Sequence, residues 1–314
     1  MSVLAEARDL EVVFDGRLRA VDRVSLQLNA GETLGLVGES GSGKTTIAKA
    51  IMGLCAPTAG TVWFEGRDVS SFGRRERLAF RARAQLMFQD PVSALSPRLT
   101  VRSLLTEPLK IHGRESKAGL ARVLELMRAV GLSEDLLPKY PHQISGGQAR
   151  RVGIARALVL DPALIVADEP TAGLDVSVQG DLLNLLADLR GRYGLTYLMI
   201  SHNLNVIRKV CDRVAVLYLG QVVEIGPGSR VFAAPAHPYT HALIGANPEI
   251  DPAKRRERVV LKGEIPSPMR PPPGCRFHTR CPKAQERCRV EEPKLRPMGE
   301  GRPSAACHFP LPPP

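Results

Sequence analysis

The sequence predicts an α/β fold with a parallel or mixed sheet. Short apolar runs alternate with helix-like segments over residues 33–200, an order typical of strand–helix–strand units. A glycine-rich turn joins one apolar run, 33–37, to a helix start. Residues 241–314 hold 15 of the 26 prolines, so a second, loop-rich region begins near residue 240.

Composition narrows the class of protein. With 314 residues, 44% of them hydrophobic, the chain can bury a large core. It contains no run of about 18 apolar residues and no signal-peptide core at its start, so we expect a cytoplasmic location. The net charge is +11, and residues 241–314 hold 14 Lys/Arg against 8 Asp/Glu. No basic patch interleaved with aromatic residues accompanies this charge, so a solvated basic face is favoured over nucleic-acid binding.

The first ninety residues contain several strand patterns. Residues 10–14 and 21–28 alternate between apolar and polar side chains, which predicts strands. A turn at 29–32 precedes the apolar strand 33–37. After the first helix, 61–68 predicts a short antiparallel strand, and 85–90 a further strand.

Residues 100–145 favour an inserted helical subdomain. Helical spacing relates five apolar residues, namely Leu120, Val123, Leu124, Met127 and Val130. Loops are expected at Pro108, Gly113, Pro138 and Pro141. The α/β pattern then resumes with a helix at 149–158, a strand at 163–167, a helix through 182–189 and a strand at 196–200.

The glycine-rich turn has the pattern G-x-x-x-x-G-K-T. It consists of Gly38, Glu39, Ser40, Gly41, Ser42, Gly43, Lys44 and Thr45, and Thr46 follows in the helix. Glycines let successive N–H groups turn toward phosphate oxygens, and the helix N-terminus adds positive potential. A lysine then suits the β- and γ-phosphates and a hydroxyl suits Mg²⁺. The turn predicts a nucleoside-triphosphate site.

Two acidic residues, Asp168 and Glu169, directly follow the apolar run 163–167. Ligands of α/β proteins lie at the carboxyl ends of the strands. One acid there can hold Mg²⁺ and a second can polarise an attacking water. The pair therefore adds a candidate hydrolytic centre to the triphosphate site.

The segment 144–158 begins Ile-Ser-Gly-Gly-Gln and continues as a helix. In order with the phosphate loop, Gln89, the two acids and Ser201-His202, it resembles the signature motif of ATP-binding-cassette (ABC) ATPases. The resemblance covers roughly residues 5–310. It implies a phosphate-loop α/β core with a mixed sheet, an antiparallel β subdomain, an inserted α-helical subdomain and a small C-terminal extension, with ATP and Mg²⁺ as ligands.

The resemblance also implies roles at the nucleotide site. Gln89 matches the glutamine that senses Mg²⁺ and water and couples the helical subdomain to membrane subunits. Glu169 matches the catalytic base, His202 the switch histidine near the γ-phosphate, and Asp168 a Mg²⁺ ligand. Phe14 matches an aromatic residue that stacks on adenine, with packing in the core as the alternative.

Other matching residues act across a dimer in that family. Ser145, Gly146, Gly147 and Gln148 match the signature residues that cap the γ-phosphate on the opposing subunit, and Asp175 matches the D-loop residue that contacts it. Ile144, Ala149 and Gly173 depart from the usual residues. None of the three changes removes a chemical group, so a hydrolysing site is still expected.

The C-terminal region narrows the resemblance. Segments 236–243, 263–268 and 272–278, with 88–101, resemble ATPases of oligopeptide and dipeptide importers. This implies a sister ABC ATPase subunit, two transmembrane permease subunits, an extracytoplasmic peptide-binding protein and a place on the cytoplasmic face of the membrane. We expect a nucleotide-binding domain at 1–240, with the helical subdomain at about 90–150, and the extension at 241–314.

Four cysteines cluster in the extension: Cys275, Cys281, Cys288 and Cys307. A reducing compartment disfavours disulfides, so metal binding is the stronger interpretation. Their spacing fits neither a zinc ribbon nor a ferredoxin run, which leaves zinc and a 4Fe–4S cluster open, with His278 and His308 as substitute ligands. The resemblance favours a structural 4Fe–4S cluster. Free thiols and a redox sensor that regulates the ATPase remain alternatives.

Two alternatives to a peptide importer also remain. One keeps the importer but changes its cargo to a nickel chelate, glutathione or an opine. The other is a cassette ATPase without a transport role that acts on ribosomes or DNA. Such proteins usually carry two cassettes or a long coiled coil, and the sequence shows neither.

Overall fold

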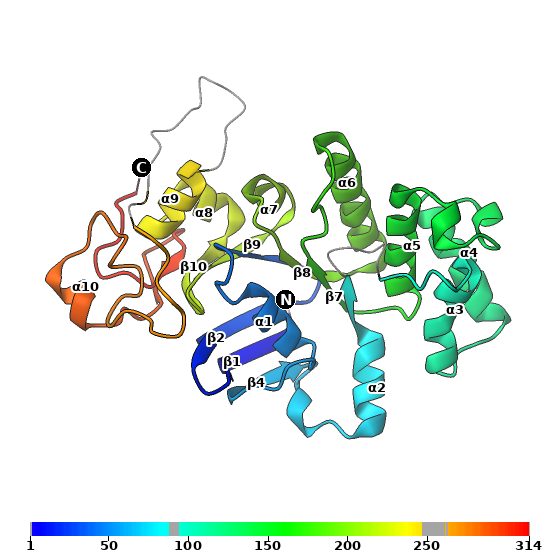
Figure 1. Ribbon diagram of the computed structural model, residues 1–314, viewed down its shortest axis with the longest axis horizontal. Helices are drawn as coiled ribbons and strands as arrows, with labels where there is room; N and C mark the ends of the chain where they lie inside the picture. Colours follow the sequence, from blue (N-terminus) through cyan, green and yellow to red (C-terminus); the bar gives the residue numbers. More distant parts are fainter. Residues whose placement is uncertain (1, 88–93, 247–260, 262, 314) are drawn as a thin grey trace.

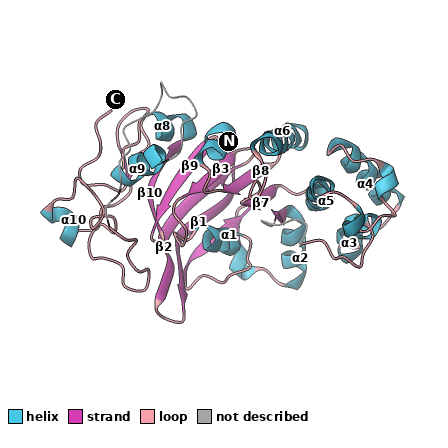
Figure 2. Cartoon of the chain, turned by 45° about the horizontal axis from the view of Figure 1, so that its top comes forward, coloured by secondary structure: helices cyan, strands magenta, loops and turns pink. Residues whose placement is uncertain are grey.

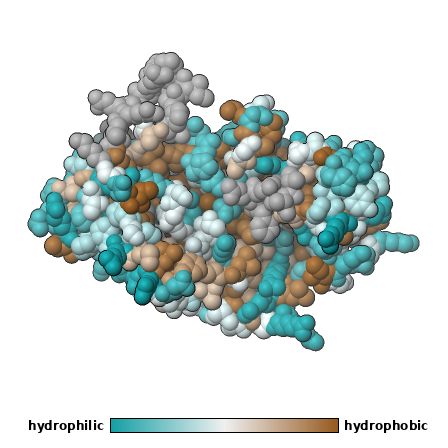
Figure 3. All heavy atoms as spheres, viewed as in Figure 1, coloured by the Kyte–Doolittle hydropathy of each residue, from teal (hydrophilic) through white to brown (hydrophobic). Residues whose placement is uncertain are grey.

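The computed structural model describes residues 2–87, 94–246, 261 and 263–313 (Figure 1). Within that part of the chain the strands form an eight-stranded and a four-stranded sheet. No helix in the described ranges is long and apolar enough to cross a membrane. On the face shown in Figure 3, hydrophilic and hydrophobic side chains are interspersed.

The large sheet is mixed, as the sequence predicts. Its central strands β9, β3, β8, β7 and β6 run parallel, whereas β10, β12 and β11 add antiparallel pairs at one edge. In spatial order the strands are β11 (Arg296–Pro297), β12 (Ser304–Ala305), β10 (Gln221–Pro227), β9 (Arg213–Tyr218), β3 (Thr33–Val37), β8 (Thr196–Ile200), β7 (Leu164–Asp168) and β6 (Ala84–Met87).

The small sheet is antiparallel and forms the predicted β subdomain. Its order is β2 (Leu18–Asn29), β1 (Val3–Phe14), β4 (Ala59–Phe64) and β5 (Arg67–Asp68). Buried and exposed residues alternate along most of β2, because one face of this sheet packs against the core. The predicted strand 61–68 is thus a hairpin of two strands.

Ten α-helices complete the described chain. They are α1 (Lys44–Ile51), α2 (Arg74–Arg83), α3 (Val101–Ile111), α4 (Lys117–Ala129), α5 (Gly146–Leu158), α6 (Val176–Tyr193), α7 (Leu204–Val210), α8 (Gly228–Ala233), α9 (Pro238–Ala246) and α10 (Glu286–Val290). Short 3-10 helices lie at Val69–Ser71, Glu134–Leu136 and Pro141–Gln143. Helices α3, α4 and α5 gather at one end of the molecule (Figures 1 and 2), as expected for an inserted helical subdomain.

The hydrophobic core has two parts, one on each face of the large sheet. Successive residues of a strand point to opposite faces. In β8, Tyr197 and Met199 therefore pack in the cluster that contains the buried leucines of α6. Leu198 and Ile200 pack in the other cluster, with α1 and the small sheet. Apolar residues on both faces explain why β3 and β8 are buried over their whole length.

One expected loop is wrong. Pro108 lies inside α3, not between helices. Proline removes one hydrogen bond, to the carbonyl four residues back, and usually ends or bends a helix. Here the buried face made by Leu104, Leu105 and Leu109 outweighs that loss, since most helix stability in proteins comes from tertiary packing.

The C-terminal segment lies at the opposite end from the helical subdomain (Figure 1). After α9, the helices and strands among its described residues are α10, β11 and β12. Strand β12 pairs with β10 through Ala305 opposite Glu224, so the extension continues the edge of the large sheet. In the strand order, β10 and β9 lie between the extension and β3, the strand that leads into the phosphate loop.

Candidate nucleotide site

The phosphate loop connects β3 to α1, the order that its motif requires. Gly38, Gly41 and Gly43 have positive φ angles of 151°, 77° and 100°. A Cβ atom at Gly38 would clash with the Leu217 carbonyl, and one at Gly43 with the Ala20 carbonyl. The backbone of the neighbouring strands therefore permits only glycine at these two positions.

Lys44 folds over the loop that precedes it. Its ammonium donates hydrogen bonds to the carbonyls of Gly38 and Glu39, at 2.9 and 2.8 Å, and to Ser42 Oγ at 3.2 Å. Burial lowers the pKa of Lys44 below its ordinary value, and the carboxylates of Glu169, Asp168 and Glu39 partly oppose this effect. The charge is thus held at the centre of the loop, where nucleotide phosphates bind in sites of this type.

Thr45 and Asp168 form the second part of the site. Thr45 Oγ1 donates to Asp168 Oδ2 at 3.0 Å, which joins the start of α1 to the end of β7. Burial raises the pKa of Asp168, and Glu169 adds to the rise. A hydroxyl beside a carboxylate supplies the hard oxygen ligands that Mg²⁺ prefers, so the residues present fit this ion.

Glu169 and His202 lie side by side at the ends of neighbouring strands β7 and β8. His202 Nδ1 is 2.8 Å from the Glu169 carboxylate, and the His202 N–H donates to Glu169 Oε1 at 3.1 Å. Glu169 has a φ of 51°, rare for a residue with a Cβ. Its N–H donates to the Ile200 carbonyl at 2.9 Å. The strained backbone is thus fixed by the neighbouring strand, as is typical of functional sites.

The signature residues start helix α5. Ser145 Oγ accepts from the Gln148 N–H at 3.2 Å, and Gln148 Oε1 accepts from the Ser145 N–H at 3.0 Å. This reciprocal cap leaves Gly146 and Gly147 in the exposed first turn. Exposed N–H groups at a helix N-terminus can bind an anion. Helix α5 lies well apart from α1 in two different views (Figures 1 and 2).

Asp175, the predicted D-loop residue, also has a local structural role. It precedes α6, and its carboxylate accepts from the Val178 N–H at 2.9 Å. The next residue, Val176, is 81% exposed. The start of α6 therefore presents an apolar side chain to the surroundings beside a capping carboxylate.

The sequence also predicts Phe14 and Gln89 at the nucleotide site. Phe14 lies at the end of β1 beside the hairpin turn and is 41% exposed, so its side chain does not pack in the core. Gln89 lies outside the described residues. The exposure of Phe14 removes the alternative that the sequence left open for it.

The four cysteines of the extension surround one small cavity. Cys275, Cys281, Cys288 and Cys307 line it together with His278 and His308. Burial raises the pKa of Cys275 to about 12 and that of Cys307 to about 11. Each histidine has one ring nitrogen 2.9 Å from a backbone carbonyl.

The cavity does not have the geometry of a single-ion site. In the described ranges, no three His, Cys, Asp or Glu side chains come close enough together to hold one metal ion. Zinc bonds of about 2.3 Å would require sulfur atoms in close contact. The described part of the chain thus shows no metal-binding group at the four cysteines, and the iron–sulfur cluster stays a prediction.

Sequence reasoning missed two residues of the loop's surroundings. Arg280 donates to both carboxylate oxygens of Glu39, at 2.7 and 3.0 Å, and Tyr239 Oη accepts from the Glu39 N–H at 3.0 Å. Arg280 and Glu39 are 241 positions apart. No local pattern relates them, so only the folded chain reveals the contact.

The site can now be compared with known proteins. A family model described as ABC transporter matches residues 21–172, and one described as oligopeptide/dipeptide transporter, C-terminal region, matches residues 223–288. A probable peptide ABC transporter ATP-binding protein of Sinorhizobium fredii is 50% identical over 94% of this chain and 84% of its own length. The chain belongs to the ATP-binding proteins of ABC transporters. The resemblance read from its motifs is confirmed.

Further relatives agree with this membership. A putative oligopeptide transport ATP-binding protein of Bacillus subtilis is 46% identical over 98% of this chain and 95% of its own. A dimeric ATP-binding cassette with ADP and phosphate is 30% identical, with a TM-score of 0.63, over 71% of this chain and 98% of its own. The ABC transporter component cbiO1 of Clostridium perfringens is 26% identical, with a TM-score of 0.68. That match covers 74% of this chain and 92% of cbiO1. The α/β phosphate-loop fold and the ATPase class follow.

Proposed function

We propose that this ABC ATPase hydrolyses MgATP to power the import of oligopeptides or dipeptides. The observation that carries the proposal is the joint presence of the nucleotide motifs at the strand ends of one sheet and a C-terminal region of the oligopeptide/dipeptide type. The matches to relatives that are named for peptide transport cover 84% or more of the length of each relative. These relatives favour peptides over a nickel chelate, glutathione or an opine.

Within the site, each residue has a distinct task. Backbone N–H groups from residues 38–46 and the Lys44 ammonium bind the triphosphate, and the exposed Phe14 ring stacks on adenine. Thr45 and Asp168, with Gln89, hold Mg²⁺, which when bound draws charge from the phosphate oxygens. Glu169 takes a proton from water as the water oxygen attacks the γ-phosphorus, and the bond to ADP breaks. His202 fixes the Glu169 carboxylate through the contact at 2.8 Å.

A second subunit completes the site. The exposed start of α5, at Ser145 to Gln148, lies well apart from α1 (Figure 1), so we propose that it acts on the nucleotide of a partner subunit. The dimeric cassette relative supports a head-to-tail pair in which α5 faces the partner's γ-phosphate, with Asp175 at the contact. We propose a sister ATPase as the partner subunit.

The proposed assembly also contains two transmembrane permease subunits and an extracytoplasmic peptide-binding protein. The chain would lie on the cytoplasmic face of the membrane, with 1–240 as nucleotide-binding domain, about 90–150 as the helical subdomain that contacts the permeases, and 241–314 as extension. No nucleic acid has a part in it.

The test is purification of the tagged chain from native membranes. We expect permeases, a second ATPase and a peptide-binding protein to co-purify, and labelled dipeptide or tripeptide uptake to require ATP. Co-purification of ribosomes or DNA without permeases would contradict the transport function. Uptake of nickel or glutathione but no peptide would contradict the cargo alone.

We further propose that the four cysteines hold a structural 4Fe–4S cluster. Their shared cavity and loop-rich surroundings support it, since such a segment has little core of its own. Protein purified without oxygen should absorb visible light and contain about four irons per chain, and Cys288→Ser should lose both. Colourless protein that contains one zinc per chain would contradict the cluster and show that the cysteines bind zinc.

A further inference from the structure

Glu39, the second residue of the phosphate loop, has two partners from the C-terminal part of the chain. The Arg280 guanidinium forms a two-point ion pair with its carboxylate, at 2.7 and 3.0 Å. Tyr239 Oη accepts a hydrogen bond from its backbone N–H at 3.0 Å. The side chain of this loop residue is therefore held by the C-terminal extension, and its backbone by the first turn of α9.

These partners are themselves held rigidly. The rings of Tyr218, Tyr239 and Phe277 pack together, with centroids 4.7 to 5.3 Å apart. The Arg280 guanidinium lies 5.9 Å from the Tyr218 ring centroid and its side chain is only 7% exposed. A partly buried two-point pair with a planar guanidinium is directional and specific. Its position is thus imposed on Glu39.

The charge of Glu39 matters at this place. Its carboxylate acts on Lys44, and its carbonyl accepts from the Lys44 ammonium at 2.8 Å. An unpaired carboxylate here would repel a nucleotide that carries several negative charges and would compete for the lysine. Arg280 balances that carboxylate; in addition, the pair raises the pKa of Arg280, so the arginine keeps its charge.

We propose that Arg280 and Tyr239 are positioning residues of the nucleotide site: they hold Glu39 so that the phosphate loop keeps its shape and its electrostatic balance for the triphosphate. The C-terminal extension is then part of the ATP-binding machinery. This inference rests on the nucleotide site alone. It stands whether the cargo is a peptide or not, and whichever metal the cysteines bind.

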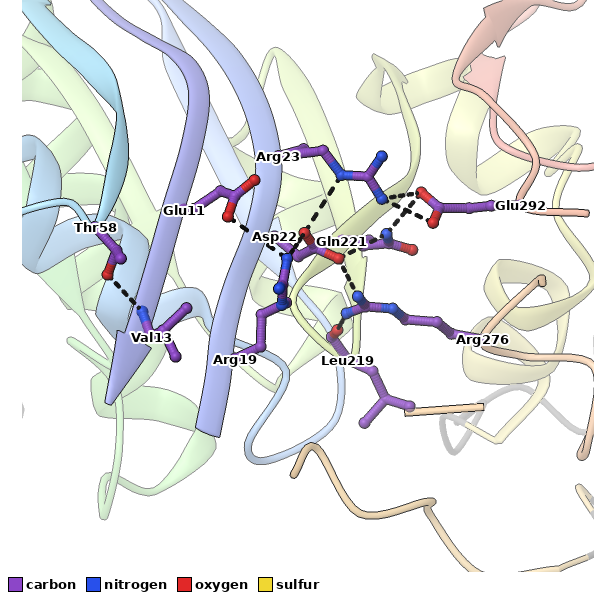
Figure 4. A network of polar contacts seen from close by, with 10 residues as sticks. All are labelled: Glu11, Val13, Arg19, Asp22, Arg23, Thr58, Leu219, Gln221, Arg276 and Glu292. Atoms are coloured by element: carbon purple, nitrogen blue, oxygen red, sulfur yellow. Dashed lines mark hydrogen bonds and ion pairs between the residues drawn. The ribbon is translucent and has the colours of Figure 1, made fainter. Parts of the chain in front are cut away.

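The ion pair can be separated from simple docking of the extension. A different pair, Arg276 with Asp22, joins the extension to β2 and does not involve Glu39 (Figure 4). Loss of Arg280 therefore leaves a docking contact in place. Its effect should appear in nucleotide affinity rather than in attachment of the extension.

The experiment measures the dissociation constants of MgATP and MgADP for the full chain. Arg280→Gln should raise the ATP constant about tenfold, the scale of one charged hydrogen-bond pair, and the ADP constant less, because ADP has one phosphate fewer. The rate of ATP hydrolysis by Arg280→Gln at saturating ATP should stay within about twofold of the wild-type rate. Tyr239→Phe, which removes only a hydroxyl, should raise the ATP constant about threefold.

The decisive variant is the double change Arg280→Gln with Glu39→Gln. Removing the uncompensated carboxylate should return the ATP constant to within about threefold of wild type, which a merely structural loss would not do. Arg287→Gln is the matched control, since Arg287 forms an exposed two-point pair with Glu291 in the same extension, and it should bind ATP as wild type does. Wild-type ATP affinity in Arg280→Gln and Tyr239→Phe, or no recovery in the double variant, would overturn the proposal.

Discussion

At the scale of single residues, Lys44 shows how the fold prepares a charge for its ligand. Its ammonium donates hydrogen bonds to two carbonyls and a hydroxyl of its own loop in place of water. Burial nonetheless lowers its pKa, and nearby carboxylates limit the effect. A triphosphate brings further negative charge and stabilises the protonated form, so nucleotide binding and protonation of Lys44 are coupled.

This coupling predicts the pH dependence of ATP binding. Because the pKa of Lys44 in the free protein is below its ordinary value and bound ATP raises it, affinity should be full at neutral pH. The affinity should fall as pH rises through the pKa that Lys44 has in the free protein. If ATP binding takes up one full proton, the fall is about tenfold per pH unit. Titrations with ATP from pH 7 to 10.5 would measure it.

Lys44→Ala is the control for that titration. It should bind ATP more weakly at pH 7 and lose the alkaline dependence. A wild-type affinity that stays constant up to pH 10.5 would show that the ammonium does not contribute as described.

At the scale of elements, strand ends and helix starts carry the chemistry. Strands β7 and β8 run parallel, with Asp168 opposite Ile200, so the residues after them meet at one edge of the sheet. This explains why short motifs predict that Asp168, Glu169 and His202 lie near one another, as they do here. The apolar run before each residue specifies the strand, and parallel pairing brings the ends together.

Helix α3 shows where element-level prediction fails. Pro108 was expected in a loop, yet the buried leucines beside it keep the helix continuous. Proline signals are local, whereas burial depends on neighbours from α4 and α5 in the same core cluster. Tertiary packing thus prevailed over a local breaker.

The same reasoning predicts a stabilising substitution. Pro108→Ala restores the missing N–H and should raise the free energy of unfolding by about 1–3 kcal/mol, since a proline inside a helix costs about 3 kcal/mol. Chemical denaturation would measure the change. Leu109→Ala, on the buried face of the same helix, should instead lower it by about 2–5 kcal/mol. An unchanged or lower stability in Pro108→Ala would mean that the ring itself packs favourably.

At the scale of the whole molecule, long-range ion pairs attach the extension to the core. Arg276 pairs with Asp22, and the two side chains are 9% and 2% exposed. Arg276 also donates to the Leu219 carbonyl. Figure 4 shows Arg19, Arg23 and Gln221 around the same carboxylate. Burial acts to raise the pKa of Asp22, but Arg276 and Arg19 outweigh it, so the pKa is lowered.

Such contacts mark the limit of prediction from sequence. Prolines and cysteines predict a separate region at 241–314, because composition is visible along the chain. Arg276 and Asp22 are 254 positions apart, and nothing near either residue indicates its partner. The same holds for Arg280 and Glu39. The position of the extension against the core therefore had to come from the fold.

Breaking the buried pair should have a large effect. Arg276→Met leaves the Asp22 charge buried with fewer partners and should lower the free energy of unfolding by about 3–5 kcal/mol. Adding Asp22→Asn to Arg276→Met should cost less than the sum of the two single changes. Denaturant titrations would test both, with the exposed Arg289→Gln expected within about 0.5 kcal/mol of wild type. Additive single effects would show that the pair does not interact.

We propose that this chain hydrolyses ATP with Glu169 as the base at the site formed by its phosphate loop. This proposal is tested most directly by steady-state ATP turnover of the complex purified through this chain, wild type against Glu169→Gln. The variant keeps the size of the side chain but cannot accept a proton. It should bind ATP with wild-type affinity while turnover falls by at least about 100-fold. ATP hydrolysis by Glu169→Gln at the wild-type rate would contradict the claim.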